Sequence, residues 1–139
     1  MAGPGFGRRD IHRQMKMEVA IRPQTGVQAT FGGTAVNRQD ATNGGASAVL
    51  HVACGIAEGA PSTQSVNGKL QHSVDGSTAW SDLGVAIPEL TNDTEDASSP
   101  NINLSGKRKF LRSVITIAFT GGSTPKIPFA ATICFGGRE

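Results

Sequence analysis

Residues 69–83 read KLQHSVDGSTAWSDL, and this stretch decides the fold. Apolar and polar residues alternate over 69–74, which is the period of a strand that buries one face. Asp75-Gly76 follows, and an Asp-Gly pair between two strand-like runs is typical of a β-hairpin with a type I′ turn, which requires positive φ at both central residues. We therefore predict two antiparallel strands, with Asp75 and Gly76 as structural residues of the turn and Trp80 as a structural residue buried in the core.

Two longer apolar runs follow this hairpin toward the C-terminus. Residues 110–119 read FLRSVITIAF and residues 127–135 read IPFAATICF. Both runs are rich in β-branched and aromatic residues, which favour strands. The turn-like sequence TGGSTP lies between them at 120–125. This pattern predicts a C-terminal hairpin in which the two runs pair directly.

The N-terminal half predicts three more strands. Residues 15–21 alternate in polarity, and we expect Pro23 to end that strand. Residues 27–31 suggest a short second strand, and the nearly continuous apolar run AVLHVACGI at 48–56 suggests a strand in the centre of a sheet. The face of the first strand that we expect to be buried consists of Met15, Met17, Val19 and Ile21.

These runs together indicate an all-β protein. They give about seven or eight strands spaced by roughly a dozen residues, which is typical of a β-sandwich or jelly roll. The 18 glycines show no three-residue period, so the chain is not collagen-like. We assign residues 1–14, with three glycines and Pro4 in the first seven positions, to a flexible basic arm, and residues 15–139 to one domain.

Charged residues form three local clusters, although the formal net charge of +2 is too small to indicate a nucleic-acid-binding surface. Such clusters are either solvated loops or complementary docking patches. The cluster that spans Lys107 to Arg112 is basic, and we call it the second basic cluster to distinguish it from the basic residues near the N-terminus. The clusters that we assign to a protein interface consist of Arg8, Arg9, Arg13 and Lys16 on the basic side, and of Glu89, Asp93, Glu95 and Asp96 on the acidic side.

Catalytic and cofactor motifs are missing from the sequence. His12, His51 and His72 have no metal-ligand spacing, and no G-x-S-x-G elbow occurs. Cys54 and Cys134 do not form a zinc motif, and we expect both to be buried, reduced and inert. Clustered carboxylates at Asp93–Asp96 leave a calcium site as a minor alternative. We expect no enzyme activity, no cofactor, and no nucleic-acid or membrane partner.

Two segments resemble a known family. Residues 70–83 match a strand, an S-x-D-G-S turn and an aromatic residue, and residues 104–117 match a strand that begins Lys107-Arg108-Lys109-Phe110. Together, with the closing apolar strand, they are similar over about residues 48–137 to the cement (decoration) proteins of tailed-bacteriophage capsids. The resemblance implies a jelly-roll-like fold on the outside of the virion. It also implies a partner, the major capsid protein, and self-association as a homodimer or homotrimer.

Two other functions stay open on the sequence. Ser73 to Trp80 loosely resembles the Asp-box of sialidases, with its glycine and threonine displaced, so a carbohydrate-binding module is one alternative. A tail or head-completion protein of a virion is the other, and copy number would separate it from cement. If the cement prediction is right, the chain is made in the host cytoplasm and acts on the outer capsid surface.

Overall fold

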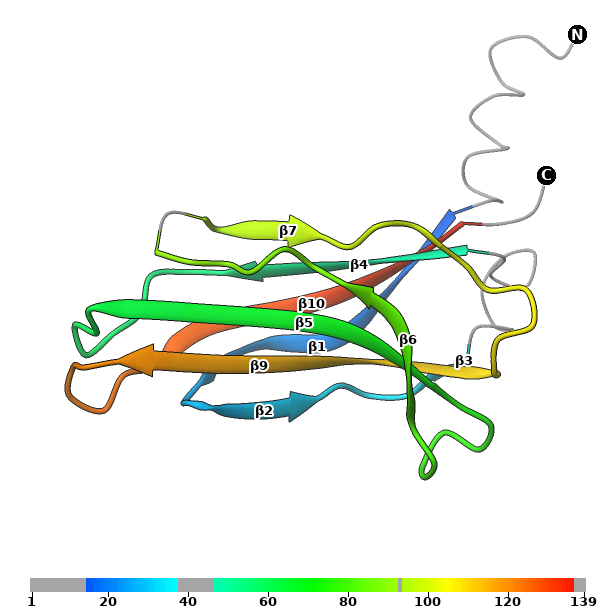
Figure 1. Ribbon diagram of the computed structural model, residues 1–139, viewed down its shortest axis with the longest axis horizontal. Helices are drawn as coiled ribbons and strands as arrows, with labels where there is room; N and C mark the ends of the chain where they lie inside the picture. Colours follow the sequence, from blue (N-terminus) through cyan, green and yellow to red (C-terminus); the bar gives the residue numbers. More distant parts are fainter. Residues whose placement is uncertain (1–14, 38–46, 93, 137–139) are drawn as a thin grey trace, which may run out of the picture.

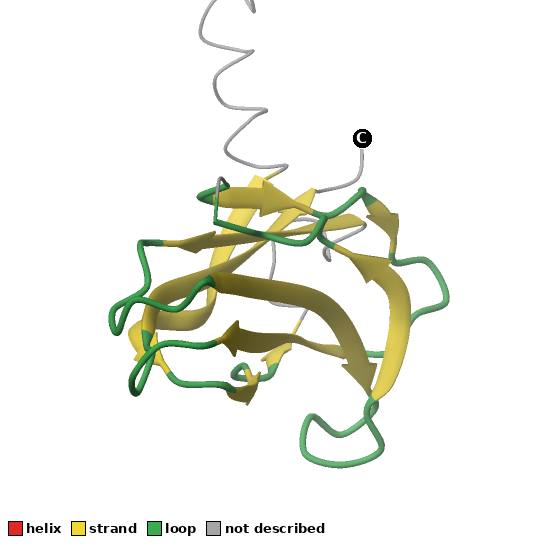
Figure 2. Ribbon diagram, turned by 60° about the vertical axis from the view of Figure 1, so that its left-hand side comes forward, coloured by secondary structure: helices red, strands yellow, loops and turns green. Residues whose placement is uncertain are grey.

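The computed structural model describes residues 15–37, 47–92 and 94–136. Its strands are β1 (Met15–Gly26), β2 (Ala29–Gly32), β3 (Val36–Asn37), β4 (Ser47–Cys54), β5 (Thr63–Ser73), β6 (Ser81–Ala86), β7 (Asp96–Ser98), β8 (Ile102–Asn103), β9 (Phe110–Thr120) and β10 (Ile127–Gly136). Within these ranges every element is a strand, drawn in yellow in Figure 2. The described residues contain no helix that could cross a membrane.

The ten strands form a sandwich of two antiparallel sheets (Figure 1). Sheet A has the order β1-β10-β4-β7, with β8 also paired to β4, and sheet B has the order β2-β9-β5-β6, with β3 also paired to β9. The predicted β-sandwich is confirmed. The strand count exceeds the predicted seven or eight because β3, β7 and β8 have only two or three residues each, too few to show a period in the sequence.

The core lies between the sheets and consists of alternate residues from the long strands. In β4 the burial alternates strictly, so that Leu50 and Val52 point inward while Val49 and His51 point outward. In β10 the inward residues include Ile133 and Phe135. The predicted central strand at 48–56 therefore lies inside sheet A, between β10 and the short strands β7 and β8.

Strand β1 differs from its prediction in both length and facing. It continues past Pro23 to Gly26, because β1 is an edge strand in which a missing N–H costs no ladder bond. The register shifts between Val19 and Ile21, so Ala20 is an extra residue and the strand changes face there. Ala20 and Ile21 are buried, whereas Met17 and Val19, which we expected to be buried, are 67% and 57% exposed.

The predicted pairing of the two C-terminal strands is wrong. β9 belongs to sheet B, where it pairs with β5, and β10 belongs to sheet A, where it pairs with β1 and β4. The turn at 121–126 therefore crosses from one sheet to the other. Apolar residues of β9 and β10 therefore enter one core from opposite sheets instead of lying side by side in one sheet. The same apolar sequence pattern is also compatible with a hairpin in which β9 and β10 pair directly.

The hairpin at 69–83 forms, with a longer connection than predicted. β5 and β6 are antiparallel with His72 opposite Ser81, and seven residues, 74–80, connect them. Gly76 has φ of 78°, but Asp75 is not among the residues with positive φ, so the connection is not the two-residue type I′ turn. Trp80 is half-buried and lies outside the core cluster.

Candidate interaction surface

The outer face of sheet A carries apolar side chains on three adjacent strands. Met17 of β1 lies opposite Cys134 of β10, and Cys134 lies opposite Val49 of β4. All three point away from the core, and Met17 is the most exposed of them. The three side chains therefore form one transverse row that is open to solvent.

Two further rows lie beside the first. Val19, Thr132 and His51 form the second, and His51 Nδ1 lies 2.8 Å from Ser98 Oγ at its end. The third row joins Ala130 to Ala53. No Asp, Glu, Lys or Arg occupies an outward position on β4 or β10, both of which are fully described. We call this surface the apolar face: Met17, Val19, Val49, Ala53, Ala130 and Cys134.

The outer face of sheet B is polar by contrast. Arg112 Nε and Nη2 donate to Gln71 Oε1 at 3.0 and 2.8 Å, and Gln71 Nε2 donates to Asp82 Oδ1 at 2.8 Å. Lys69 Nζ lies 3.1 Å from the Asp82 carboxylate. The hydrogen bonds from Gln71 and Lys69 lower the pKa of Asp82. Arg112 also covers the indole ring of Trp80. This linked series of side chains is a solvated surface rather than a dry interface.

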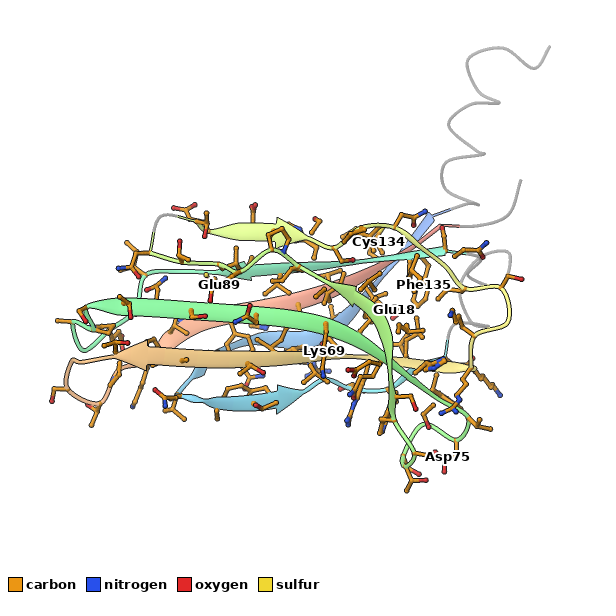
Figure 3. The ribbon with its side chains drawn as sticks, viewed as in Figure 1. Glu18, Lys69, Asp75, Glu89, Cys134 and Phe135 are labelled. Carbon is orange, nitrogen blue, oxygen red and sulfur yellow. The ribbon has the colours of Figure 1, made fainter. Side chains whose placement is uncertain are left out.

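Asp75 organises the loop at 74–80, which extends beyond the sandwich (Figure 3). Its Oδ1 accepts hydrogen bonds from the backbone N–H groups of Ser77 and Thr78, both at 2.9 Å, and from Ser73 Oγ. Its Oδ2 accepts from Thr78 Oγ1 at 2.7 Å. These bonds, led by the hydroxyl of Thr78, hold the pKa of Asp75 far below its usual range. The predicted structural role of Asp75 follows from this geometry.

Residues of the second basic cluster hold the same loop against the sandwich. Arg108 Nη1 donates a hydrogen bond to Ala79 O at 3.0 Å. The backbone of Gly76 lies so close to the ring of Phe110 that a Cβ atom at this position would be only 3.0 Å from the ring. Ala79 has φ of 55°, a conformation that non-glycine residues rarely adopt. At least part of the predicted basic cluster is therefore structural.

The acidic residues assigned to the interface do not form one patch. Glu89 is exposed beside sheet B and accepts a hydrogen bond from Ser65 Oγ of β5 at 2.6 Å (Figure 3). Asp96 begins β7 of sheet A, opposite Ala53, and Glu95 precedes it. Asp93 lies outside the described residues. Only Glu95 and Asp96 border the apolar face.

Most of the basic residues assigned to the interface cannot be placed. Arg8, Arg9 and Arg13, and the whole predicted arm at 1–14, lie outside the described residues. The backbone of Lys16 belongs to β1, where it lies opposite Phe135. The described chain thus begins at the edge of sheet A, next to the apolar face.

The two cysteines point to opposite sides of sheet A, so no disulfide joins them. Cys54 is buried, and its burial raises the thiol pKa, with the negative charges of Glu95 and Asp96 adding to the effect. Cys134 is only half-buried, on the apolar face, which differs from the prediction that both would be buried. Both thiols are free.

Two surface depressions of the described residues contain few titratable groups. One of about 450 Å³ contains Glu89 among hydroxyl and amide residues, and one of about 230 Å³ on sheet B contains Lys69. Within 15–37, 47–92 and 94–136, no three His, Cys, Asp or Glu residues come together in a group that could hold a metal ion. We therefore treat the sheet faces as the candidate site.

The apolar face was missed by sequence reasoning. Its signal is that neither the outward nor the inward positions of β4 and β10 hold Asp, Glu, Lys or Arg. We interpreted 48–56 as a central strand and 127–135 as one strand of a C-terminal hairpin, and we assigned no interface to the outer side of either run. The structure shows that nothing in the described chain covers the outward side.

Comparisons with known proteins support the fold. No family model matches the chain, and no curated protein matches its sequence. The PBSX exported protein XepA has a TM-score of 0.59 at 7% identity, and the match covers 89% of this chain but only 38% of XepA. The chain therefore shares its fold with part of XepA.

Two other solved structures are less similar. The family 22 carbohydrate-binding module of Clostridium thermocellum Xyn10B has a TM-score of 0.48 at 15% identity, covering 88% of this chain and 81% of the module. The capsid of Helicobacter pylori bacteriophage KHP30 has a TM-score of 0.39 at 12% identity, covering 87% and 92%. TM-scores below 0.5 carry no argument about this chain, so its own surfaces must carry any functional argument.

Proposed function

We propose that this chain is a decoration subunit that binds the outer surface of a tailed-phage capsid and clamps neighbouring major capsid subunits. The observation that carries the proposal is the apolar face, a rigid sheet surface with exposed Met17 and Val19 and no charge on its two central strands. Exposed apolar patches of this kind mark sites of protein association.

The geometry of the apolar face suits a flat partner. Val49, Ala53 and Ala130 are small, so a partner backbone can approach the sheet closely. The antiparallel hydrogen bonds of β10, which is paired on both sides, keep the surface rigid. A rigid surface loses little conformational entropy on docking, and many copies on one lattice add their modest contacts.

The charged groups near this face give the proposed contact an orientation. Glu95 and Asp96 border the face beside β7. In our proposal these two carboxylates pair with basic groups of the capsid and so fix the position of the subunit on its surface. The basic arm predicted at 1–14, which precedes β1 in the sequence, reaches a neighbouring capsid subunit in the same proposal. Rim charges of this kind control association rate and specificity more than affinity.

The finer parts of the proposal rest on the two resembling segments. They are similar to virion proteins, and our proposal identifies the chain with the cement protein of a Bordetella phage, although the segments alone do not separate cement from a tail or head-completion protein. The proposal also includes self-association, synthesis in the host cytoplasm and no catalytic role. Purified virions should contain the chain in a copy number close to that of the major capsid protein. A handful of copies per particle would instead identify a tail or head-completion protein.

A binding experiment tests the apolar face directly. Heads of the encoding phage that lack the chain would be mixed with wild-type protein or with Val49→Lys, and the bound fraction would be measured by co-sedimentation. A lysine there buries a charge in the proposed contact, so binding should fall at least tenfold. Lys69→Glu on the outer face of sheet B is the matched control and should bind as wild type does. Equal binding by Val49→Lys would contradict the proposal.

A carbohydrate-binding module remains the second candidate, and one observation favours it. The depression beside Lys69 on sheet B lies on the same face as the half-buried indole of Trp80. Sugars stack on aromatic faces, although Arg112 already covers one face of this ring. A glycan array with reproducible hits that Trp80→Ala removes would support this candidate. An array without hits would eliminate it.

A further inference from the structure

We propose that the outer face of sheet B binds an uncharged polysaccharide chain, which lies along β5 in a groove that joins the two surface depressions. This inference rests on the carbohydrate-binding candidate and extends it by naming the site and the class of glycan. It does not depend on the capsid-binding function, because the groove and the apolar face belong to different sheets of the sandwich. One subunit therefore has a separate face for each partner.

Hydrogen bonds connect the two depressions along β5. Ser65 and Glu89 line the first depression, and Asn67 lines the second. Asn67 Nδ2 donates to Ser65 Oγ at 3.1 Å, and Ser65 Oγ donates to Glu89 Oε2 at 2.6 Å. Ser65 and Asn67 both point away from the core, because Val66 between them is fully buried. The two depressions are therefore neighbours on one face. We call them together the β5 groove: Ser65, Asn67, Lys69, Glu89, Val114 and Thr116.

The β5 groove is long enough for a chain of sugars. Its β5 residues run from Thr63 to Lys69, and a strand rises by about 3.4 Å per residue, so the groove is about 20 Å long. Beyond Lys69 the polar surface continues, because Gln71 binds both Asp82 and Arg112. A single sugar would occupy only part of this length. The ligand that fits the whole groove is therefore a polysaccharide chain parallel to β5.

The charged side chains of the groove balance one another. Among the described residues that line it or border it, the cations are Lys69 and Arg112, and the carboxylates are Glu89 and Asp82. Lys69 is already paired with Asp82, with 3.1 Å between Nζ and the carboxylate. A nucleic acid or another polyanion would place its negative charges beside the two carboxylates. An uncharged chain meets no such repulsion, so the charge balance favours a neutral glycan.

Open hydrogen-bonding atoms favour a hydroxyl-rich ligand over a protein. Within the described part of the chain, Asn67 Oδ1 and Glu89 Oε1 receive no hydrogen bond. Thr116, opposite Asn67 on β9, adds a hydroxyl that can donate or accept. Sugar hydroxyls also donate and accept, so they can satisfy this mixture of groups. A protein partner would need an apolar, desolvated centre, whereas the apolar side chain of Val114 in the groove is only 9% exposed.

A glycan array that carries neutral, sialylated and sulfated chains tests the class of ligand. The wild-type protein should bind neutral glycans. Calorimetry with the strongest neutral hit should show an affinity that rises with chain length and changes little between low and high salt, because no net charge is neutralised on binding. An array without hits, or with hits only among the acidic glycans, would overturn the inference. A single sugar that binds as tightly as its longer chain would also overturn it.

Substitutions locate the site within sheet B. Asn67→Ala and Glu89→Ala should each weaken the binding of that neutral glycan by roughly 2- to 10-fold, because each removes a hydrogen bond to the ligand. Asn101→Ala is the matched control, an exposed asparagine outside the groove, and should bind as wild type does. The melting temperature of each variant would show that it is folded. Binding that Trp80→Ala removes and that Asn67→Ala and Glu89→Ala leave unchanged would support the carbohydrate-binding candidate but overturn the β5 groove.

Two variants separate this site from the apolar face. Lys69→Glu removes a donor from the β5 groove, so it should weaken glycan binding while it co-sediments with heads as wild type does. Val49→Lys should show the reverse, with normal glycan binding and weak binding to heads. A folded variant that loses both activities would overturn the assignment to separate faces. Wild-type protein that binds heads but no neutral glycan would overturn this inference alone, and wild-type protein that binds the glycan but not heads would overturn only the capsid-binding function.

Discussion

Arg112 covers the indole ring of Trp80, with Arg112 Cζ 4.4 Å from the ring centroid. The ring lies on the outer face of sheet B and not in the core. Trp80→Ala removes a cation–π contact and a partly buried side chain, so it should lower the free energy of unfolding by about 1–2 kcal/mol. The substitution of a core aromatic residue would lower it by roughly 3–5 kcal/mol. Denaturant unfolding measures the difference.

Phe135→Ala is the comparison for that prediction, because Phe135 is fully buried in β10 and should show the full core loss of about 3–5 kcal/mol. A double-mutant cycle between Trp80 and Arg112 should give a coupling of about 0.5–1 kcal/mol. A Trp80→Ala loss as large as that of Phe135→Ala would show that the indole supports the core.

Two fully buried serines should respond oppositely to alanine substitution. Ser113 Oγ has no hydrogen-bond partner among the described residues, so Ser113→Ala should raise the free energy of unfolding by about 1 kcal/mol. Ser73 Oγ shares its single proton between Asp75 Oδ1 and Thr78 O and accepts from Gly76 N–H, so Ser73→Ala should lower the free energy of unfolding by about 0.5–1.5 kcal/mol. Thermal unfolding of both variants against wild type tests the pair, and a destabilised Ser113→Ala would reveal a partner for that hydroxyl.

The loop at 74–80 should loosen in acid. The pKa of Asp75 is lowered in the folded state by its hydrogen bonds, so the carboxylate stabilises the fold above its unfolded pKa of about 3.9. That contribution is lost as the pH falls through the folded pKa. Asp75→Asn keeps an acceptor oxygen but removes the charge. The melting temperature of wild type should therefore exceed that of Asp75→Asn at pH 6 and approach it progressively below pH 4. A difference that is constant with pH would contradict the assignment.

The sequence was sufficient to predict strands wherever a run was long. β4, β9 and β10 lie where alternation or β-branched runs indicated them, whereas β5 contains the alternating run from residue 69 but begins six residues earlier, at Thr63. The sequence did not predict which strands pair, because apolar runs such as those of β9 and β10 are equally compatible with two arrangements. They can lie side by side in one sheet or face each other across a core. Only the complete set of strands decides between these arrangements.

Strand β1 shows why facing is harder to predict than strand content. Its alternation indicated that Met17 and Val19 would be buried, and the extra residue at Ala20 reverses that assignment. A bulge shifts every earlier residue to the opposite face, and no local residue preference announces it. The apolar face, with Met17 and Val19 at its edge, was therefore missing from the sequence prediction.

The candidate interface shows the limit of charge patterns in a sequence. Glu89 and Asp96 lie seven positions apart and were assigned to one patch, but they belong to surfaces on different sheets. Arg108, part of a basic cluster, is engaged with the backbone of Ala79. Charge clusters in sequence predict polarity, whereas the topology of the sandwich decides which charges share a face.

Electron cryomicroscopy of decorated heads is the most direct test of the central claim. The account predicts that the outer face of sheet A, with Met17, Val49 and Cys134, lies against the major capsid protein, while Lys69 and Trp80 on sheet B face solvent. A map in which sheet B contacts the capsid and the apolar face is open to solvent would contradict it.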